Sequence, residues 1–401
     1  MQSPERFSAL PEYAFSRLRR LLDGHAPGGP EIAMSIGEPR HPLPPIIAAT
    51  VAAHAAEFGR YPPNDGVEEL LAAAAGWIGR RYGVPIDPER ELIALSGTRE
   101  GLFNAALALS PETKAGGRPV VLTPNPFYQA YGAAALAVGA EPVMVAATRS
   151  TGFLPDFAAL PVRLLDRVSL AYVCSPSNPQ GAVADEQYWR ALIGLAERHD
   201  FIVLVDECYS EIWRGTPPVG ALAVARTMGA DPERVMAFHS LSKRSSAPGL
   251  RSGFAAGGRA AIAAMRRLRA YGGAPSPLPL QRAAAALWRD ETHVEASRAM
   301  YVAKFAAADA VLGDLPGYIA PQAGFFLWLR AGDGEATTLR LWREAGVKVL
   351  PGAYLGRATP DGPNPGQDYI RVALVAGLDD VTRGLGAIRA VLGATQSVAR
   401  V

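Results

Sequence analysis

The sequence predicts an α/β protein in which helices flank a mostly parallel β-sheet. Seven short runs of apolar or β-branched residues recur between positions 92 and 256, and Ala-rich stretches separate several of them. Alanine is the strongest helix former, so we expect the separating stretches to be helices. The expected strands are Leu92–Leu95, Val120–Thr123, Pro142–Val145, Leu170–Cys174, Phe201–Val205, Val235–Phe238 and Gly253–Ala256.

Polar and turn-forming residues follow the first, second and fourth expected strands. After the first strand, Gly97, Thr98 and Arg99 open a helical stretch whose free backbone N–H groups suit a phosphate. Tyr128 follows the second strand and can stack on a flat ring, and Asn178 follows the fourth in the turn SPSNPQG. Each residue alone also has an ordinary explanation as a turn or core residue. Because such folds bind ligands beyond the carboxyl ends of their strands, we expect these side chains to converge.

An acidic residue follows the fifth expected strand. Asp206 comes directly after the apolar run FIVLV, and Tyr209 lies three residues further on. A carboxylate next to such a run is costly to bury unless a partner compensates its charge. The sequence therefore predicts a partner for Asp206.

The segment SLSKRSSAPGLRSG, after the sixth expected strand, carries the most informative chemistry. Ser240, Ser242, Lys243 and Arg251 place two hydroxyls, an amine and a guanidinium in one loop. An amine forms an imine with a carbonyl, and the planar fork of an arginine binds phosphate. Lys243 is one of only four lysines in the chain, so lysine is not a routine surface residue here. Together these groups predict pyridoxal 5'-phosphate, a phosphorylated aldehyde, as the cofactor.

The bulk composition disfavours several classes of function. The formal net charge is +2 and no basic block is interleaved with aromatic residues, so we expect no nucleic-acid partner. Cys174 and Cys208 show neither disulfide nor metal-ligand spacing, so we expect no metal and a reducing compartment. No apolar run reaches the roughly 18 residues of a membrane helix, and the N-terminus lacks a signal-peptide core. We therefore expect a cytoplasmic protein that acts on small molecules.

In order, spacing and residue type, these motifs resemble the class I and II aminotransferases, the fold-type I pyridoxal-phosphate enzymes with the fold of aspartate aminotransferase. The resemblance implies a large domain with a mostly parallel seven-stranded sheet flanked by helices, and a smaller α/β domain. We expect the cofactor-binding domain at residues 46–280 and the small domain, with an N-terminal arm, at residues 1–45 and 281–401. Within the second region, AGFFLWL, VKVLPG and YIRVALVAG are expected to be strands.

The resemblance also implies a role for each polar residue. Lys243 would hold the aldehyde of the cofactor as a Schiff base, and Asp206 would pair with the ring nitrogen. Tyr209 and Asn178 would hydrogen-bond the phenolic oxygen, and Tyr128 would stack on the ring. Lys243, Asp206 and Tyr209 are thus the expected catalytic residues. The residues expected at the phosphate are Gly97, Thr98, Arg99, Ser240, Ser242, Arg251 and, from the neighbouring subunit of a homodimer, Tyr61.

Substrate recognition is expected to involve an arginine near the C-terminus. Arg371 in YIRVALV matches the family's arginine for the α-carboxylate of the amino acid, with the backbone of Gly37 and the side chain of Asn178 nearby. A bidentate pair between arginine and carboxylate fixes orientation as well as charge. Without the resemblance, Arg371 would be read as a strand residue that pairs with a surface acid.

Longer phrases resemble the N-succinyldiaminopimelate aminotransferases of bacterial lysine biosynthesis: GEPRHPLP, NPFYQAY, DECYSEIW, HSLSKRSSAPGLRSGF, VLPGAYLGR and NPGQDYIRVALVAG. We expect glutamate as the amino donor and a keto acid or semialdehyde as the acceptor, in particular N-succinyl-2-amino-6-oxopimelate. AYGGAPSPLPLQ departs from that group, so an aspartate-, alanine- or acetylornithine-type aminotransferase, a C–S β-lyase and a regulatory ligand-binding protein remain alternatives. Arg40, Arg60 and Arg282 are candidates for reading the distal end of the substrate.

Overall fold

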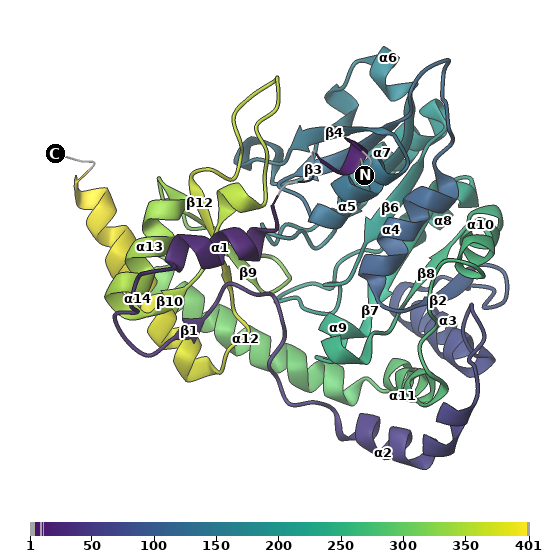
Figure 1. Cartoon of the computed structure of the whole chain (residues 1–401), viewed down its shortest axis with the longest axis horizontal. Coiled ribbons are helices and arrows are strands. Elements are labelled where there is room, and N and C mark those ends of the chain that lie inside the picture. Colours follow the sequence, from purple (N-terminus) through teal and green to yellow (C-terminus); the bar gives the residue numbers. More distant parts are fainter. Residues whose placement is uncertain (1–4, 9, 11, 399–401) are drawn as a thin grey trace.

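The computed structural model describes residues 5–8, 10 and 12–398, and its largest element is a seven-stranded sheet (Figure 1). The strand order is β2 (Leu92–Leu95), β8 (Gly253–Gly257), β7 (Val235–Ser240), β6 (Ile202–Asp206), β5 (Val168–Cys174), β3 (Val120–Asn125) and β4 (Glu141–Ala146). Strand β8 is antiparallel to both of its neighbours, and the other four pairs are parallel. The mostly parallel α/β fold is confirmed, and each expected strand ends within two residues of its observed bounds.

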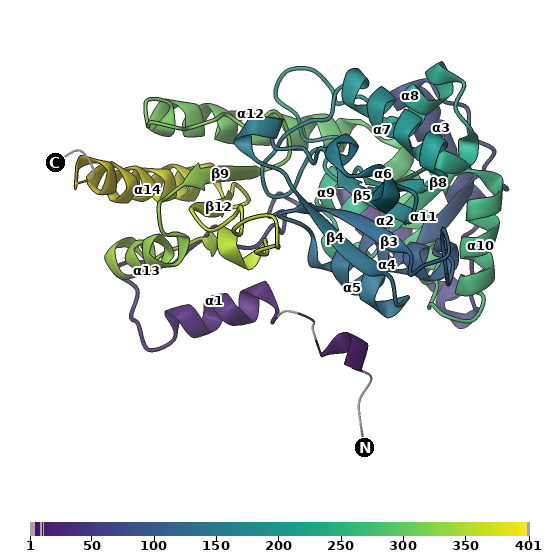
Figure 2. The same ribbon diagram turned by 90° about the horizontal axis from the view of Figure 1, so that it is seen from above.

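Helices cover both faces of this sheet, because successive side chains of a strand point to opposite faces. One face packs against α4 (Thr98–Leu109), α5 (Gln129–Ala137) and α10 (Arg259–Arg269). The opposite face packs against α3 (Glu68–Tyr82), α7 (Glu186–His199), α8 (Ala221–Met228) and α11 (Leu278–Arg289). Figure 2 shows α7 and α8 on one side of the strands and α5 on the other. Burial on both faces explains why the strands read as continuous apolar runs.

A second group of elements surrounds a small antiparallel sheet of β11 (Leu350–Pro351), β12 (Tyr369–Ala373) and β9 (Phe326–Arg330). Beside it, β1 (Ile32–Ala33) pairs in parallel with β10 (Val347–Lys348). Its helices are α1 (Ala14–Leu22), α12 (Thr292–Leu312), α13 (Gly334–Ala345) and α14 (Leu378–Val398), grouped to one side in Figure 2. The three expected C-terminal strand regions therefore contain strands. The domain boundaries stay a prediction, and residues 1–4, 9, 11 and 399–401 of the expected small domain lie outside the described residues.

The two sheets meet through the segment that follows β6. Tyr209 packs edge-on against Phe325, with ring centres 5.3 Å apart, and against Phe326, at 5.8 Å. Phe326 is the first residue of β9, so this contact places the carboxyl end of β6 beside the smaller sheet. The remaining described helices are α2 (Pro45–Ala53), α6 (Val162–Leu165), α9 (Leu241–Arg244), η1 (Glu5–Phe7), η2 (Ala55–Gly59), η3 (Arg149–Thr151), η4 (Phe157–Ala159), η5 (Pro232–Arg234), η6 (Pro248–Leu250) and η7 (Gly352–Tyr354).

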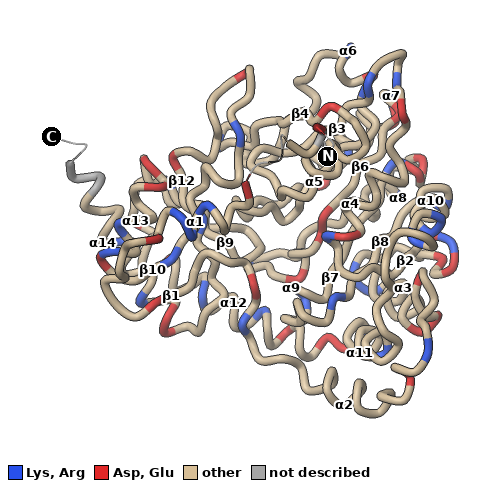
Figure 3. Tube along the Cα trace, viewed as in Figure 1, with Lys and Arg blue, Asp and Glu red and all other residues tan. Residues whose placement is uncertain are grey.

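The distribution of charge and hydropathy agrees with the composition. Basic and acidic residues are interspersed over the elements of both sheets (Figure 3). Among the described residues, no helix combines the length and apolar character required to cross a bilayer.

Candidate active site

A cavity of about 500 Å³ lies at the carboxyl ends of β5, β6 and β7, beside the smaller sheet. This volume is within the range of small-molecule sites. Of the expected site residues, Gly97 and Tyr61 do not line it; Gly97 lies directly behind Arg251, and Tyr61 is fully exposed. The expected residues that line it are Gly37, Thr98, Arg99, Tyr128, Asn178, Asp206, Tyr209, Ser240, Ser242, Lys243, Arg251 and Arg371.

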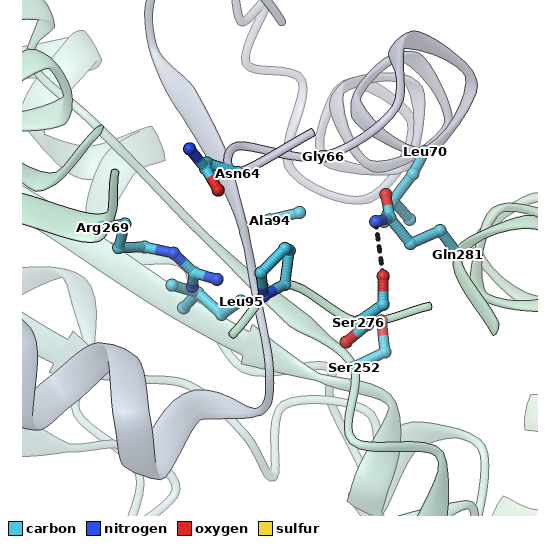
Figure 4. Close-up of a pocket in the computed structure, with 10 residues that line it drawn as sticks. Asn64, Gly66, Leu70, Ala94, Leu95, Ser252, Arg269, Ser276 and Gln281 are labelled. Carbon is cyan, nitrogen blue, oxygen red and sulfur yellow. Dashed lines mark hydrogen bonds between the residues drawn. The ribbon is translucent and has the colours of Figure 1, made fainter. Parts of the chain in front are cut away.

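A second, much smaller cavity lies beside Arg269, Ser276 and Gln281 (Figure 4). Its volume is about 10 Å³, which is close to the space that a single water molecule needs. Gln281 spans one wall, where its Nε2 donates to the carbonyl of Ser276 at 2.8 Å. A metabolite cannot fit there, so the larger cavity is the candidate site.

Lys243 lies on the one-turn helix α9, directly after β7. The side chain of Ser240 caps this helix by accepting a hydrogen bond from the backbone N–H of Ser242 at 3.1 Å. Lys243 Nζ donates to the carbonyl of Gly37 at 2.5 Å and lies 5.5 Å from the ring centre of Phe325. Burial lowers the pKa of Lys243 from 10.5 to about 8. Such an amine can both accept and release a proton near neutral pH.

Asp206 is the last residue of β6 and is 6% exposed. Tyr131 Oη donates to its Oδ2 at 2.8 Å, and the backbone N–H of Cys208 donates to its Oδ1 at 3.2 Å. Burial raises the pKa of Asp206 above its usual value, and the hydrogen bonds from Cys208 and Tyr131 oppose that rise. Among the described residues, no Lys, Arg or His nitrogen lies within 4.0 Å of this carboxylate. The site is therefore suited to a cation that enters the cavity.

The start of α4 and the loop around α9 place phosphate-binding groups together. Thr98 is the first residue of α4, whose N-terminal N–H groups are free to bind an anion. Arg251 donates only to two backbone carbonyls and has no described carboxylate within 4.0 Å. A Cβ at Gly97 would lie 2.2 Å from Arg251 Nη2, and φ there is +92°, so this position requires glycine. The hydroxyl-bearing side chains that share this wall are Ser240 and Ser242.

Arg371 lies in β12 and is 4% exposed. Its Nη1 donates to Asn178 Oδ1 at 3.0 Å, its Nη2 donates to the carbonyl of Ser35 at 2.8 Å, and its Nε is buried without a partner. Burial lowers the pKa of Arg371 to about 10, so the group remains a cation at neutral pH. A buried guanidinium without a carboxylate partner, facing a cavity, is suited to the carboxylate of a substrate.

The aromatic residues of the cavity are held by polar neighbours. Asn178 Nδ2 donates to Tyr209 Oη at 3.5 Å, which extends the contact between Arg371 and Asn178 toward Asp206 along the chain. Arg99 Nε donates to Tyr128 Oη at 2.5 Å. Tyr128 therefore lies on the cavity wall with its hydroxyl fixed, as a stacking residue requires.

The sequence interpretation missed several lining residues. Tyr131 and Cys208 contact Asp206 directly, and Tyr13, Phe15 and Glu38 come from the N-terminal segment. The only available signal for Tyr131 was its spacing of three from Tyr128, which places both on one face of α5. Arg40, Arg60 and Arg282, the candidates for the distal end of the substrate, do not line the cavity; Arg282 instead pairs with Glu57 and Glu69.

The cavity residues fit pyridoxal 5'-phosphate. Asp206, without a cationic neighbour, matches a protonated ring nitrogen, and Arg251, without an acidic one, matches the phosphate. Lys243 supplies the amine that an aldehyde requires. The described residues contain no group of three or more His, Cys, Asp or Glu side chains placed to hold a metal ion.

Comparisons with known proteins agree with this chemistry. Residues 30–384 match the family described as "Aminotransferase class I and II". An LL-diaminopimelate aminotransferase of Desulforudis audaxviator is 32% identical over 400 residues, which cover 97% of each chain.

Solved structures show the same architecture. An aminotransferase of Neisseria meningitidis superposes with a TM-score of 0.92 at 36% identity and covers 96% of this chain and 99% of its own. A probable N-succinyldiaminopimelate aminotransferase of Thermus thermophilus superposes with a TM-score of 0.81 at 26% identity, over 94% of this chain and all of its own.

Proposed function

The chain belongs to the class I and II aminotransferases, and from that premise we propose that it transfers the amino group of glutamate to N-succinyl-2-amino-6-oxopimelate. The family depends on pyridoxal 5'-phosphate and acts on amino acids and keto acids. Transaminase activity follows from membership. The identity of the acceptor and the role of each side chain are the proposal.

Lys243 is the proposed acid and base of the reaction. When bound, pyridoxal 5'-phosphate supplies an aldehyde and a ring that withdraws electrons from the α-carbon of the substrate. Lys243 would hold that aldehyde and, once displaced, move the proton at the α-carbon. Its Nζ is directed into the cavity by the Gly37 carbonyl, and its pKa of about 8 suits both directions of transfer. A positioned proton transfer of this kind contributes typically about 10²–10⁴-fold to a rate.

Asp206 would keep the ring nitrogen protonated. Its carboxylate is fixed by Tyr131 and by the backbone of Cys208, so it is already oriented before any cation arrives. A charge that needs no reorganisation stabilises the developing charge of a transition state more than a mobile one does. Tyr131 is thus a positioning residue that acts through Asp206.

The observation that carries the amino-acid part of the proposal is the buried, acid-free guanidinium of Arg371 in the same cavity as Lys243. Bound there, an α-carboxylate would neutralise the charge and occupy the unused donor. Because Arg371 is fixed by Asn178 and Ser35, it would also orient the α-carbon toward Lys243.

Arg99 supports an acceptor with an acidic distal end. It lines the cavity, has no described carboxylate within 4.0 Å, and is held against Tyr128. With Arg371 at the reacting end, Arg99 would bind a second carboxylate, as present in both glutamate and diaminopimelate derivatives. Aromatic keto acids offer no such group.

Direct use of LL-diaminopimelate is the second candidate. Relatives at about 30% identity carry that name, and Glu38 lines the cavity as an acid suited to the free distal ammonium group. Acylation removes that ammonium, so the two candidates differ in the charge that Glu38 would meet.

We further propose a cytoplasmic homodimer. Tyr61 is an aromatic residue with full exposure in one chain, which suits a contact with a second copy. In that arrangement its hydroxyl would reach the phosphate of the partner's cofactor.

The test is a screen of acceptors with glutamate as the donor, with formation of 2-oxoglutarate as the readout. The purified, cofactor-loaded enzyme is offered N-succinyl-2-amino-6-oxopimelate, tetrahydrodipicolinate, N-acetylglutamate semialdehyde, oxaloacetate, pyruvate and an aromatic keto acid. The proposal expects the highest kcat/KM with the succinylated acceptor.

Other outcomes separate the alternatives. Preference for tetrahydrodipicolinate would establish the LL-diaminopimelate reaction in place of the succinylated one. Absence of 2-oxoglutarate with every acceptor, together with release of pyruvate and ammonia from cystathionine, would overturn the proposal in favour of a C–S lyase.

A further inference from the structure

Arg357 is a partly buried arginine without an acidic partner, and it lies directly behind the wall of the cavity. Its neighbour Leu355 lines the cavity, as does Phe127, whose ring centre is 5.6 Å from the Arg357 guanidinium. Its Nη1 donates to the carbonyl of Gly356 at 2.7 Å, whereas its Nη2 is shielded from solvent and has no hydrogen-bond partner.

The backbone around Arg357 is held in place by the end of β3. Asn125 Nδ2 donates to the carbonyl of Arg357 at 2.8 Å, and the N–H of Arg357 donates to Asn125 Oδ1 at 3.0 Å. The N–H of Phe127 also donates to the carbonyl of Leu355 at 3.0 Å. Three bonds therefore fix this residue against the strand that leads to the cavity wall, so the position of its guanidinium is defined by the fold.

The surroundings of Arg357 differ from those of other shielded arginines. Arg244, Arg269 and Arg81 each pair with a carboxylate, at 2.7, 3.0 and 2.7 Å. Among the described residues no carboxylate oxygen lies within 4.0 Å of Arg357. Burial and the charge of Arg17 lower the pKa of Arg357, so its surroundings are short of negative charge. An unused donor in such a corner is satisfied best by a carboxylate.

The proposed substrate has one more carboxylate than the cavity arginines account for. The reacting end of N-succinyl-2-amino-6-oxopimelate carries one, the carbon next to the amide carries a second, and the succinyl group ends in a third. Arg371 and Arg99 are assigned to the first two. Glutamate and free diaminopimelate have only two, so a third cationic subsite would serve the acylated compound alone.

We propose that Arg357 binds the terminal carboxylate of the succinyl group and thereby selects the acylated substrate over free diaminopimelate. This inference rests on the proposed function and deepens it. The substrate chain would pass Phe127 and Leu355, and the Nη2 donor that is unused in the structure would form the new bond.

The test compares binding and turnover of two substrates in the cofactor-loaded enzyme and its Arg357→Gln variant. The substrates are N-succinyl-LL-diaminopimelate and LL-diaminopimelate, with binding measured by calorimetric titration and turnover with 2-oxoglutarate as acceptor. Loss of one charge-assisted hydrogen bond predicts a rise of about 10- to 100-fold in Kd and KM for the succinylated compound. The kcat should change little, and the KM for glutamate and for LL-diaminopimelate should stay the same.

Arg17→Gln is the matched control, because it removes a neighbouring positive charge that already pairs with Glu335 at 3.3 Å. It should leave the preference for the succinylated compound intact, and Arg357→Lys should restore part of the affinity. Unchanged Kd and KM in Arg357→Gln, or equal losses with all three substrates, would refute the role of Arg357 while leaving the proposed function standing. A wild-type enzyme that neither binds nor converts the succinylated compound would refute both.

Discussion

Lys243→Met in the cofactor-free protein tests whether the amine at position 243 is buried as its proposed role requires. Burial displaces the pKa of Lys243 from 10.5 to about 8, and at 1.36 kcal/mol per pKa unit this corresponds to about 3 kcal/mol against the charged form. The amine keeps some solvent access through the cavity, so screening reduces the figure to about 1–3 kcal/mol. Methionine keeps the apolar stem and removes the charge.

The sign of the effect follows from proton binding. Below pH 8 the amine is protonated in both the folded and the unfolded protein, so the wild type carries the whole cost and Lys243→Met should be more stable. Between pH 8 and 10.5 the unfolded state binds more protons than the folded state, so the stability of the wild type rises with pH relative to the variant. The advantage of the variant should therefore fall to less than half between pH 7 and pH 9.5.

The assay is denaturant unfolding of both proteins at the two pH values, after removal of the cofactor and at one protein concentration. Lys348→Met is the matched control, because Lys348 Nζ lies 2.8 Å from Glu31 and its loss brings no relief of burial. A Lys243→Met variant less stable than the wild type at pH 7, or an advantage independent of pH, would refute the reasoning.

Three further predictions concern the proposed site. Asp206→Asn should retain the cofactor, measured by absorbance, but lose at least about 100-fold in kcat, because a neutral amide cannot keep the ring nitrogen protonated. Tyr131→Phe removes the 2.8 Å hydrogen bond to Asp206, which raises the pKa of that carboxyl and should move the acid limb of the pH–activity profile upward; an unmoved limb would contradict its positioning role. Tyr61→Phe mixed with Lys243→Met should regain activity as heterodimers if Tyr61 acts on the partner's site, and no regain would argue for separate sites.

The fold was predictable wherever local sequence decides it. Strands buried on both faces read as apolar runs, and each of the seven runs became a strand of one sheet. The direction of β8 was not predictable, because Gly253–Ala256 has the same apolar character whether its neighbours run parallel or antiparallel. Strand direction depends on connections, which composition does not encode.

Residues that follow strands could be found because position in the chain places them at one edge of the sheet. Asp206 and Ser240 are of this kind. Tyr131 could not be found this way, since its contact with Asp206 depends on which face of α5 meets β6. The same holds for Arg282, which looked free in the sequence but is held by Glu57 and Glu69 once α11 packs against η2 and α3. Gly97 was expected at the phosphate, and the structure shows in addition that its missing side chain makes room for Arg251.

Reduction of the cofactor-loaded enzyme with borohydride, followed by peptide mass spectrometry, tests the central claim most directly. The reagent fixes the cofactor permanently to the amine that holds it, and the chain has only four lysines to choose from. The account predicts the added mass on the peptide that contains Lys243, at one label per chain. A label on Lys114, Lys304 or Lys348, or no label in an enzyme that transaminates, would contradict it.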